Sequence, residues 1–276
     1  MTTWRRLDPL SRTGLVCLVV LVLAALAGSV FGLGGNPDGI VGSRLAPPSW
    51  QWPLGTDQLG RSMLPRVLEG IGTTLLLSTL AVLVTASLST VLGIVAGYRG
   101  GWLAELVLRM VDVLYSFPTI VLAILVAAVL GPGQAATLCS IVLVTIPLMT
   151  RLVRTAAMTV SERDYITSAV ISGVGWWRIL ARHVLPNVSG TIAVQGTYAL
   201  SVGILVEGGL SFLGFGVQPP ESSLGVLIQQ GGIYLLAAPW LLAFPGVVLV
   251  VAILAINVFG DGLRDRLEPR ESRSLV

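Results

Sequence analysis

The sequence predicts an all-α membrane protein with six transmembrane helices and both termini in the cytoplasm. Of its 276 residues, 54% are hydrophobic and 11% are charged, whereas an ordinary soluble domain carries about 25% charged residues. The mean hydropathy of +0.86 shows that the deficit of charge is general. Long charge-free runs recur along the chain, and most arginines fall on one side of them. Lipid is therefore the expected solvent for most of this chain.

Charge-free runs locate the helices, because an ionised side chain at the bilayer centre costs about 2.5–3.5 kcal/mol. The predicted order is a cytoplasmic N-terminus at 1–14, a helix at 15–35, an outer loop at 36–69, a core at 70–262 and a cytoplasmic tail at 263–276. Within the core, helices are expected at about 72–97, 108–130, 134–155, 188–214 and 240–260, with a cytoplasmic loop at 156–187.

The first two helices rest on uninterrupted apolar runs. The first run, 15–33, lies between Arg12 and Asp38, and the second, 70–98, is rich in Leu, Val, Thr and Ala. A signal peptide is the alternative for the first run, because arginines precede it and Ala25-Leu26-Ala27 resembles a cleavage site. Apolar sequence continues beyond that site, which favours a retained helix.

The other four helices come from runs that are broken by turn residues or by one acid. Gly131-Pro132-Gly133 divides the run that follows Asp112 into two helices joined by a short turn. The fifth run contains Glu207, and the sixth begins at about Trp240 after a stretch rich in Pro and Gly.

The positions of the arginines predict the orientation. All 17 basic residues are Arg, and with a cytoplasmic N-terminus all of them except Arg44, Arg61 and Arg66 lie on the cytoplasmic side. This is the positive-inside bias of membrane proteins, so both termini are expected in the cytoplasm. The formal net charge of +3 is too small to indicate a nucleic-acid partner.

The outer loop contains a cluster of turn residues, namely Gly55, Thr56, Asp57, Gly60 and Arg61. This spacing favours a turn in which a side-chain oxygen caps a short helix, and Trp50 and Trp52 suit the membrane interface. The alternative is a structured extracellular linker with no further role.

The inner loop predicts two short amphipathic helices with a hinge between Gly173 and Gly175. Ser161 or Asp164 is expected to cap the first helix, and Pro186 is expected to end the second. Such helices can lie on the lipid surface, pack against their own bundle or bind a cytoplasmic partner, and periodicity does not separate these alternatives.

Few residues are available for chemistry. His183 is the only histidine, which excludes metal sites built from several imidazoles, and Cys17 and Cys139 lie in apolar stretches as expected of buried thiols. Because the chain has no Lys, it lacks the phosphate-binding GxxxxGK[ST] loop. Asp112 and Glu207 are the acids nearest to membrane depth, where charges are functional or internally paired. Glu207 either faces a cavity or pairs with an arginine or backbone groups at a subunit contact, and the pairing is favoured. For Asp112 a bond to Arg109 or a neighbouring loop is favoured.

Several segments together resemble a known family. The inner loop, Glu162-Arg-Asp-Tyr165-Ile-Thr167-Ser168-Ala169, Gly173 and Arg182-His183-Val-Leu185-Pro186-Asn187, resembles the EAA loop of permease subunits in binding-protein-dependent ABC importers. Pro53-Leu-Gly55-Thr56-Asp57-Gln-Leu-Gly60-Arg61 resembles a second signature, that of the dipeptide, oligopeptide and nickel branch. Further likenesses are Arg109-Met-Val-Asp112 to Pro118, Glu207-Gly-Gly-Leu-Ser211 to Gly216, and Asn257 to Asp265.

The resemblance implies the fold of a type I ABC importer permease in a bacterial or archaeal cytoplasmic membrane. It implies four kinds of partner: a second homologous permease subunit, two ATPase subunits or a fused one, an extracytoplasmic substrate-binding protein and the lipid bilayer. ATP and Mg would be bound by the ATPase subunits, and this chain would have no cofactor, metal or catalytic site. The residues implied in ATPase coupling are Asp164, Tyr165, Thr167, Ser168, Ala169, Gly173, Arg178 and Pro186.

The sequence departs from the family pattern at informative positions. Thr167 stands where the family usually has Glu, and Ser168 where it has the first Ala. Loss of the carboxylate removes a possible charge-assisted contact of about 1.5–3 kcal/mol. In the outer signature, Trp52 and Ser62 replace a common His and a common Asp. Docking is therefore expected to rely more on shape and backbone here.

The resemblance favours di- or oligopeptides as cargo, and a nickel or other metal chelate is the alternative. An ion-coupled secondary transporter is a rival from another class, but it would need coupling-ion groups near mid-membrane and an inverted repeat. An intramembrane enzyme is disfavoured, because Gly209-Leu-Ser211-Phe lacks the second Gly of GxSxG.

Overall fold

The computed structural model describes residues 8–267, and this part of the chain forms helices and loops without a β-strand. Its helices are α1 (Pro9–Ser29), α2 (Met63–Arg99), α3 (Gly101–Tyr115), α4 (Thr119–Leu130), α5 (Gln134–Ser161), α6 (Asp164–Ile171), α7 (Trp176–Ile179), the π-helical turn η2 (Leu180–Val184), α8 (Leu185–Phe212), α9 (Leu224–Ile233) and α10 (Trp240–Leu267). The predicted all-α class is confirmed.

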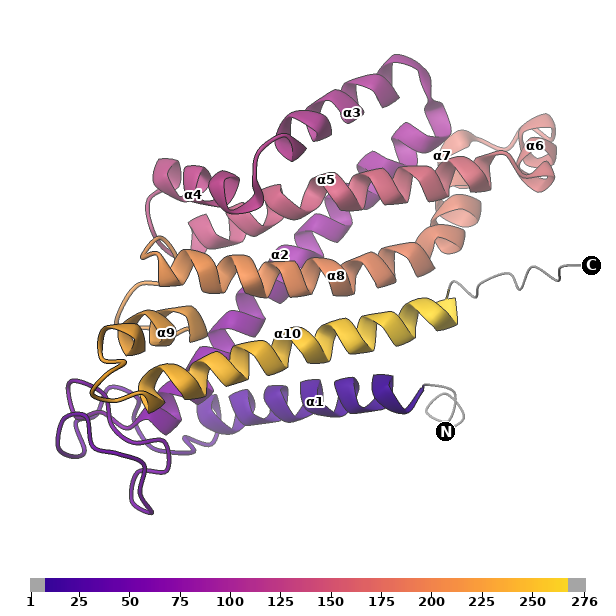
Figure 1. Ribbon diagram of the computed structural model, residues 1–276. Helices are drawn as coiled ribbons and strands as arrows, with labels where there is room; N and C mark the ends of the chain where they lie inside the picture. The colour runs from indigo at the N-terminus through magenta and orange to yellow at the C-terminus, as the bar shows by residue number, and fades with distance from the viewer. Residues whose placement is uncertain (1–7, 268–276) are drawn as a thin grey trace, which may run out of the picture.

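Most of the long helices lie side by side as a bundle (Figure 1). Within residues 8–267, five helical stretches are long and apolar enough to cross a membrane, and the α3–α4 pair makes a sixth if it counts as one broken span. Helix α2 runs obliquely across the others and packs against α1, α5 and α8. The six predicted spans therefore correspond to these five stretches and the bent pair.

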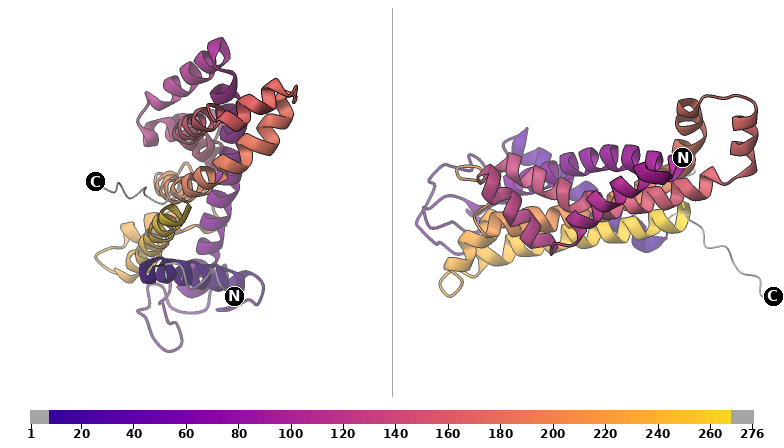
Figure 2. Two further views of the ribbon diagram at one scale, coloured as in Figure 1. Left: turned by 90° about the vertical axis from the view of Figure 1, so that its right-hand side faces the viewer. Right: turned by 90° about the horizontal axis from the view of Figure 1, so that it is seen from above.

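The two ends of the bundle differ in what they carry. Helices α6 and α7 lie at one end, together with the start of α1 and the end of α10 (Figures 1 and 2). The loop 30–62 and α9 lie at the opposite end. We call the end with α6 and α7 the inner end and the other the outer end.

The predicted helix 108–130 is wrong as a single helix. The structure has α3 and α4 there, bent by 92° at the break between them. Pro118 is the residue before α4, with φ of −55° and ψ of 133°. Proline has no amide hydrogen and disfavours helical geometry in the residue before it, so α3 ends shortly before Pro118.

Several helix boundaries also differ from those expected. Helix α1 occupies 9–29 instead of 15–35, and α2 starts at Met63 instead of about 72. The early start of α2 places Arg66 inside the helix, where its side chain is buried and paired. The expected start of α2 was placed after the nearest charged residues. A charge that is paired, as that of Arg66 is, does not end a helix.

Two glycine contacts bring pairs of helices close together. Gly93 and Gly97 of α2 face α5, where a Cβ on Gly97 would lie 2.7 Å from the carbonyl oxygen of Arg154. Similarly, α1 packs along α10, and a Cβ on Gly14 would lie 2.7 Å from the carbonyl oxygen of Ala255. Small residues allow backbones in a membrane to approach in this way.

Candidate functional site

The inner loop forms a short two-helix projection that is fixed to the bundle by buried side chains. Ile166 of α6 and Ile179 of α7 are both buried in a cluster with Ile94, Met149 and Val153 from α2 and α5. The projection therefore packs partly against its own bundle, as one of the three alternatives expected.

Aromatic residues of α7 also hold the projection against the bundle. The rings of Trp176 and Trp177 stack with their centroids 3.8 Å apart, and the guanidinium of Arg99 lies 4.3 Å from the centroid of Trp176. Such a cation–π contact contributes about 0.5–1 kcal/mol at an exposed site. Because Arg99 ends α2, the contact ties the projection to the inner end of that helix.

Gly173 makes the turn between α6 and α7. Its φ is +74°, a conformation that L residues with a Cβ rarely adopt. The amide of Gly173 donates to the carbonyl of Val170 and the amide of Val174 to that of Ala169, at 3.0 and 3.1 Å. These two bonds form a Schellman motif, which ends α6. The predicted hinge is present, and its geometry is that of a fixed turn.

The predicted capping of these helices is wrong. The Ser161 hydroxyl donates to the carbonyl of Ala157, and the residue before α6, Arg163, makes no side-chain cap. Pro186 does not end a helix either. It lies at the start of α8, directly after the π-helical turn η2, and such a local adjustment accommodates a proline within a helix. The result is a single helical stretch from Trp176 to Phe212.

The outward face of the projection is open in this chain. Its exposed residues include Asp164, Tyr165, Thr167, Ser168, Val170, Ile171, Ser172, Trp177 and Arg178. Ile171 has 81% of its surface exposed, although it is a large aliphatic side chain. Of the other predicted coupling residues, Ala169 is half-buried, and Pro186 lies beyond the projection in α8. The structure thus brings most of this set onto one projection, and their coupling role stays a prediction.

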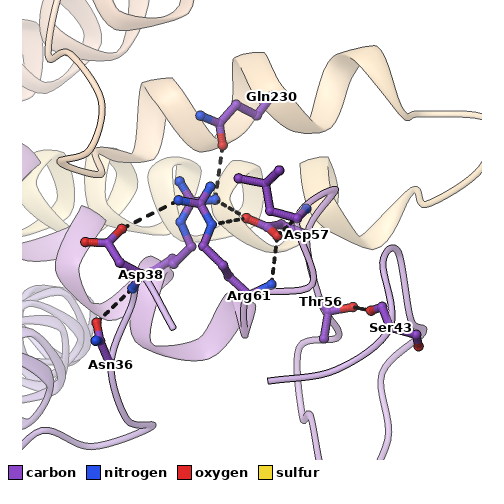
Figure 3. Close-up of polar contacts among 9 residues, drawn as sticks. Asn36, Asp38, Ser43, Thr56, Asp57, Arg61 and Gln230 are labelled. Carbon is purple, nitrogen blue, oxygen red and sulfur yellow. Dashed lines mark hydrogen bonds and ion pairs between the residues drawn. The ribbon is translucent and has the colours of Figure 1, made fainter. Parts of the chain in front are cut away.

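The outer-loop signature folds into a compact polar cluster (Figure 3). The carboxylate of Asp57 accepts bonds from the amides of Leu59 and Arg61, at 2.8 and 2.9 Å, and from Arg61 Nε at 2.7 Å. Thr56 is fully buried, and its hydroxyl donates to the carbonyl of Ser43 at 2.6 Å. Gly55 and Gly60 have φ of +76° and +81°, which the turns require.

Arg66 extends this cluster into the helices, and the sequence did not reveal it. Arg66 Nη1 donates to Asp57 Oδ2 at 2.8 Å and to Gln230 Oε1 of α9 at 3.1 Å. The side chains of Arg66 and Asp57 are only 2% and 1% exposed. We call Asp57, Arg61, Arg66 and Gln230 the Asp57 cluster. The one signal for Arg66 in the sequence is its position just before the apolar run that starts at Gly70, because a charge beside such a run needs a partner.

Glu207 is enclosed within the chain. Its side chain is 0% exposed. Its two carboxyl oxygens accept hydrogen bonds from the hydroxyls of Thr74, at 2.8 Å, and Ser211, at 2.7 Å. The Thr74 hydroxyl oxygen accepts in turn from the amide of Leu224, at 3.2 Å. We call Thr74, Glu207, Ser211 and Leu224 the Glu207 cluster. Glu207 is paired, but with hydroxyls of α2 and α8 in the same chain, and not with the arginine or backbone groups at a subunit contact that the sequence favoured.

Asp112 has a different partner from the one expected. Arg151 of α5 donates to its carboxylate at 2.5 Å, while Arg109 pairs with Glu105 on the same helix. The Arg151 guanidinium also lies 4.6 Å from the centroid of the Tyr115 ring. The Asp112–Arg151 pair joins α3 to α5 near the bend, and both side chains are partly exposed.

The described residues offer no arrangement for metal binding. No group of three or more His, Cys, Asp or Glu side chains that could hold a metal ion occurs between residues 8 and 267. What the arrangement offers is mechanical: a projection at the inner end and two polar clusters toward the outer end.

Comparison with known proteins agrees with this arrangement. The family model described as "Binding-protein-dependent transport system inner membrane component" matches residues 89–273. A putative peptide transport system permease protein of Brucella suis is 38% identical over 263 residues, which are 94% of this chain and 87% of the relative. A di/tripeptide transport system permease protein of Pseudomonas aeruginosa is 38% identical over 232 residues, covering 82% of this chain and 77% of the relative.

A solved structure shares the fold. A chain of the MetNI methionine ABC transporter, in an inward-facing conformation, superposes with a TM-score of 0.60 at 18% sequence identity. The match covers 74% of this chain and 97% of the other. The predicted fold of a type I ABC importer permease is confirmed at the level of the fold.

Proposed function

This chain belongs to the family of binding-protein-dependent transport system inner membrane components, and we propose that it is a permease subunit of an ATP-driven importer of di- or oligopeptides. The assignment of peptides as cargo rests on the 38% identity to permeases named for peptide transport, which extends over 94% of the chain in one case. A nickel or other metal chelate is the alternative cargo.

The coupling surface for ATPase subunits is the α6–α7 projection. Its inward face is packed on α2 and α5, while Tyr165, Thr167 and Ile171 face outward. A partner that binds this surface and moves therefore displaces the bundle rather than a loose loop. The mechanism is rigid-body rocking of transmembrane helices driven by closure of the ATPase subunits.

Thr167 limits how that surface binds. An exposed hydroxyl replaces the carboxylate usual in the family, so no charge-assisted bond is available at this position. The apolar side chains of Ile171 and Trp177 offer contact area instead. A groove with apolar walls on the ATPase subunit suits this surface.

The remaining tasks of such an importer belong to other subunits. This chain has no Lys for a phosphate-binding loop, so ATP and Mg belong to the ATPase subunits. A second homologous permease completes the pathway, and an extracytoplasmic binding protein delivers cargo to the outer end. The chain is a multi-pass membrane protein, and its place is the cytoplasmic membrane of a bacterium or archaeon with α6 and α7 in the cytoplasm.

Transport by the purified complex in proteoliposomes tests the proposal. The complex comprises this chain, its partner permease, the ATPase subunits and the binding protein. Labelled di- and tripeptides are expected to accumulate only with ATP and the binding protein, and collapse of proton and sodium gradients is expected to have no effect. Uptake of a nickel chelate without uptake of peptides would reject the cargo. Uptake driven by an ion gradient without ATP would reject the importer class.

A further inference from the structure

Helix α9, which packs against α2, α8 and α10, also makes hydrogen bonds to side chains of α2 at two separate places. At its start, the amide of Leu224 donates to Thr74, whose hydroxyl donates to the buried carboxyl group of Glu207. Further along α9, Gln230 accepts from Arg66 of the Asp57 cluster. The helix therefore links the outer-loop signature to α8 through buried polar contacts.

Close backbone packing prevents α9 from moving separately. A Cβ on Gly225 would lie 2.5 Å from the carbonyl oxygen of Gly208 in α8. On the side of α2, a Cβ on Gly70 would lie 3.1 Å from the carbonyl carbon of Ser223. At such distances two elements shift together or separate completely, because packed interfaces do not deform continuously.

The Glu207 cluster has the same all-or-none character. It is fully buried inside the bundle, and both carboxyl oxygens are engaged. Removing one donor leaves a buried polar group unsatisfied, which is costly in an apolar environment. The cluster is therefore stable when complete and unfavourable when partly broken.

Helix α8 carries the cluster to the inner end. The helical stretch from Trp176 to Phe212 contains 37 residues, which at 1.5 Å per residue span about 55 Å. Its first turn, α7, belongs to the projection that would contact the ATPase subunits. Displacement of that projection therefore moves Glu207 and, through Thr74 and Leu224, moves α9.

We infer that Thr74 and Glu207 are positioning residues that fasten α9 to the α7–α8 stretch, so that a binding protein seated on the outer end alters ATP hydrolysis at the inner end. This inference rests on the proposed function. It assigns no contact with cargo or nucleotide to either residue. It names the polar joint through which the two ends of the chain are coupled.

Thr74→Val tests the joint, because valine keeps the shape of the side chain and removes the hydroxyl. In proteoliposomes holding the complete complex, ATP hydrolysis is measured with and without cargo-loaded binding protein. The expected result is that the stimulation of ATP hydrolysis by the binding protein falls about tenfold. Hydrolysis in the absence of the binding protein is expected to be unchanged. Thr74→Ser, which restores the hydroxyl, is expected to restore the stimulation.

Ser78→Ala is the matched control. Ser78 lies one turn further along α2, is equally buried, and its hydroxyl has no hydrogen-bond partner. Gly225→Ala provides a second route, because its Cβ forces α9 away from α8. It is expected to reproduce the loss seen in Thr74→Val, whereas Ser78→Ala is expected to behave as wild type.

Two results would overturn the inference alone. One is unchanged stimulation in Thr74→Val, and the other is an equal fall in basal and stimulated hydrolysis, since the joint would then serve folding only. A wild-type complex that ignores its binding protein would instead overturn the proposed function and this inference with it.

Discussion

Gly173 is the residue at which backbone geometry alone restricts the side chain. Nothing lies within 4 Å of the position that its Cβ would occupy, so space is not the constraint. Its φ of +74° is the constraint. Gly175, two residues later, is equally open but has φ of −60°, which any residue adopts.

Gly173→Ala is therefore expected to loosen the α6–α7 turn, and Gly175→Ala is the control. A left-handed conformation costs a residue with a Cβ about 1–2 kcal/mol, which shifts a local equilibrium at least about fivefold. Hydrogen exchange measured by mass spectrometry should rise in the segment 164–179 for Gly173→Ala only. Equal exchange in the two variants would contradict the role of the turn.

Asp57 provides the second prediction at this scale. Asp57→Asn leaves Arg66 buried without its charged partner, and such a break costs about 3–5 kcal/mol. We expect a clear fall in the unfolding temperature of the protein in detergent. Asp38→Asn is the control, because Asp38 is half exposed and lies 3.5 Å from Arg61, where a surface pair contributes about 0–1 kcal/mol. Similar losses in both variants would contradict the buried pairing.

The sequence indicated which residues form these sites. It did not indicate the distant residues to which they bind. The outer-loop signature was found because its glycines and Thr56-Asp57 are close in the chain. The partner Gln230 lies 164 residues from Arg66, and no local pattern connects the two. For Glu207 the sequence favours an arginine or backbone groups at a subunit contact, and the hydroxyl donors were missed, since Thr74 looks like an ordinary polar residue within an apolar run.

The contact between α2 and α5 shows how a single glycine pair sets the distance between two helices. Gly93 and Gly97 form a GxxxG pattern that faces α5 within the same chain. A Cβ at Gly97 would lie 2.8 Å from that of Ala157. The close approach also places Arg154 of α5 against α2.

Gly97→Val is expected to push α2 and α5 apart. Overpacking of this kind costs about 1–3 kcal/mol, so the unfolding temperature in detergent should fall. Gly196→Val is the control, because Gly196 lies in α8 with nothing within 4 Å of its Cβ position. Equal stability of the two variants would show that the interface adjusts to the larger residue.

At the element scale, long helices were predictable and breaks were not. Charge-free runs located the spans, because lipid penalises charge wherever it is unpaired. The bend between α3 and α4 lies within an apolar run, so hydropathy does not reveal it, although Pro118 marks its place. Helix α9 was missed because its ten residues are too short for a span and contain three glycines.

The whole molecule places its two polar regions at opposite ends of an apolar bundle. The outer loop and α9 share one end, and the projection of α6 and α7 lies at the other (Figure 1). The arginine bias predicts that the projection lies in the cytoplasm. Ser49 and Ser172 are exposed residues in the outer loop and in the projection, so they can report this orientation.

Labelling of single cysteines tests the orientation in intact cells. In a background with Cys17 and Cys139 replaced by Ser, a membrane-impermeant maleimide is expected to label Ser49→Cys from outside. Ser172→Cys should react only after the membrane is permeabilised. Labelling of both positions from outside would contradict the predicted topology.

The pairing of α1 with α10 has a consequence for how the protein is made. Gly14 of α1 packs against the backbone of α10 at Ala255, and Ser11 packs against Gly262. During synthesis α1 enters the membrane long before α10 exists, so these small residues face lipid until the last span is inserted. Closure of this contact is therefore a late step of biogenesis. A chain cut short before α10 leaves this face of α1 without its partner helix.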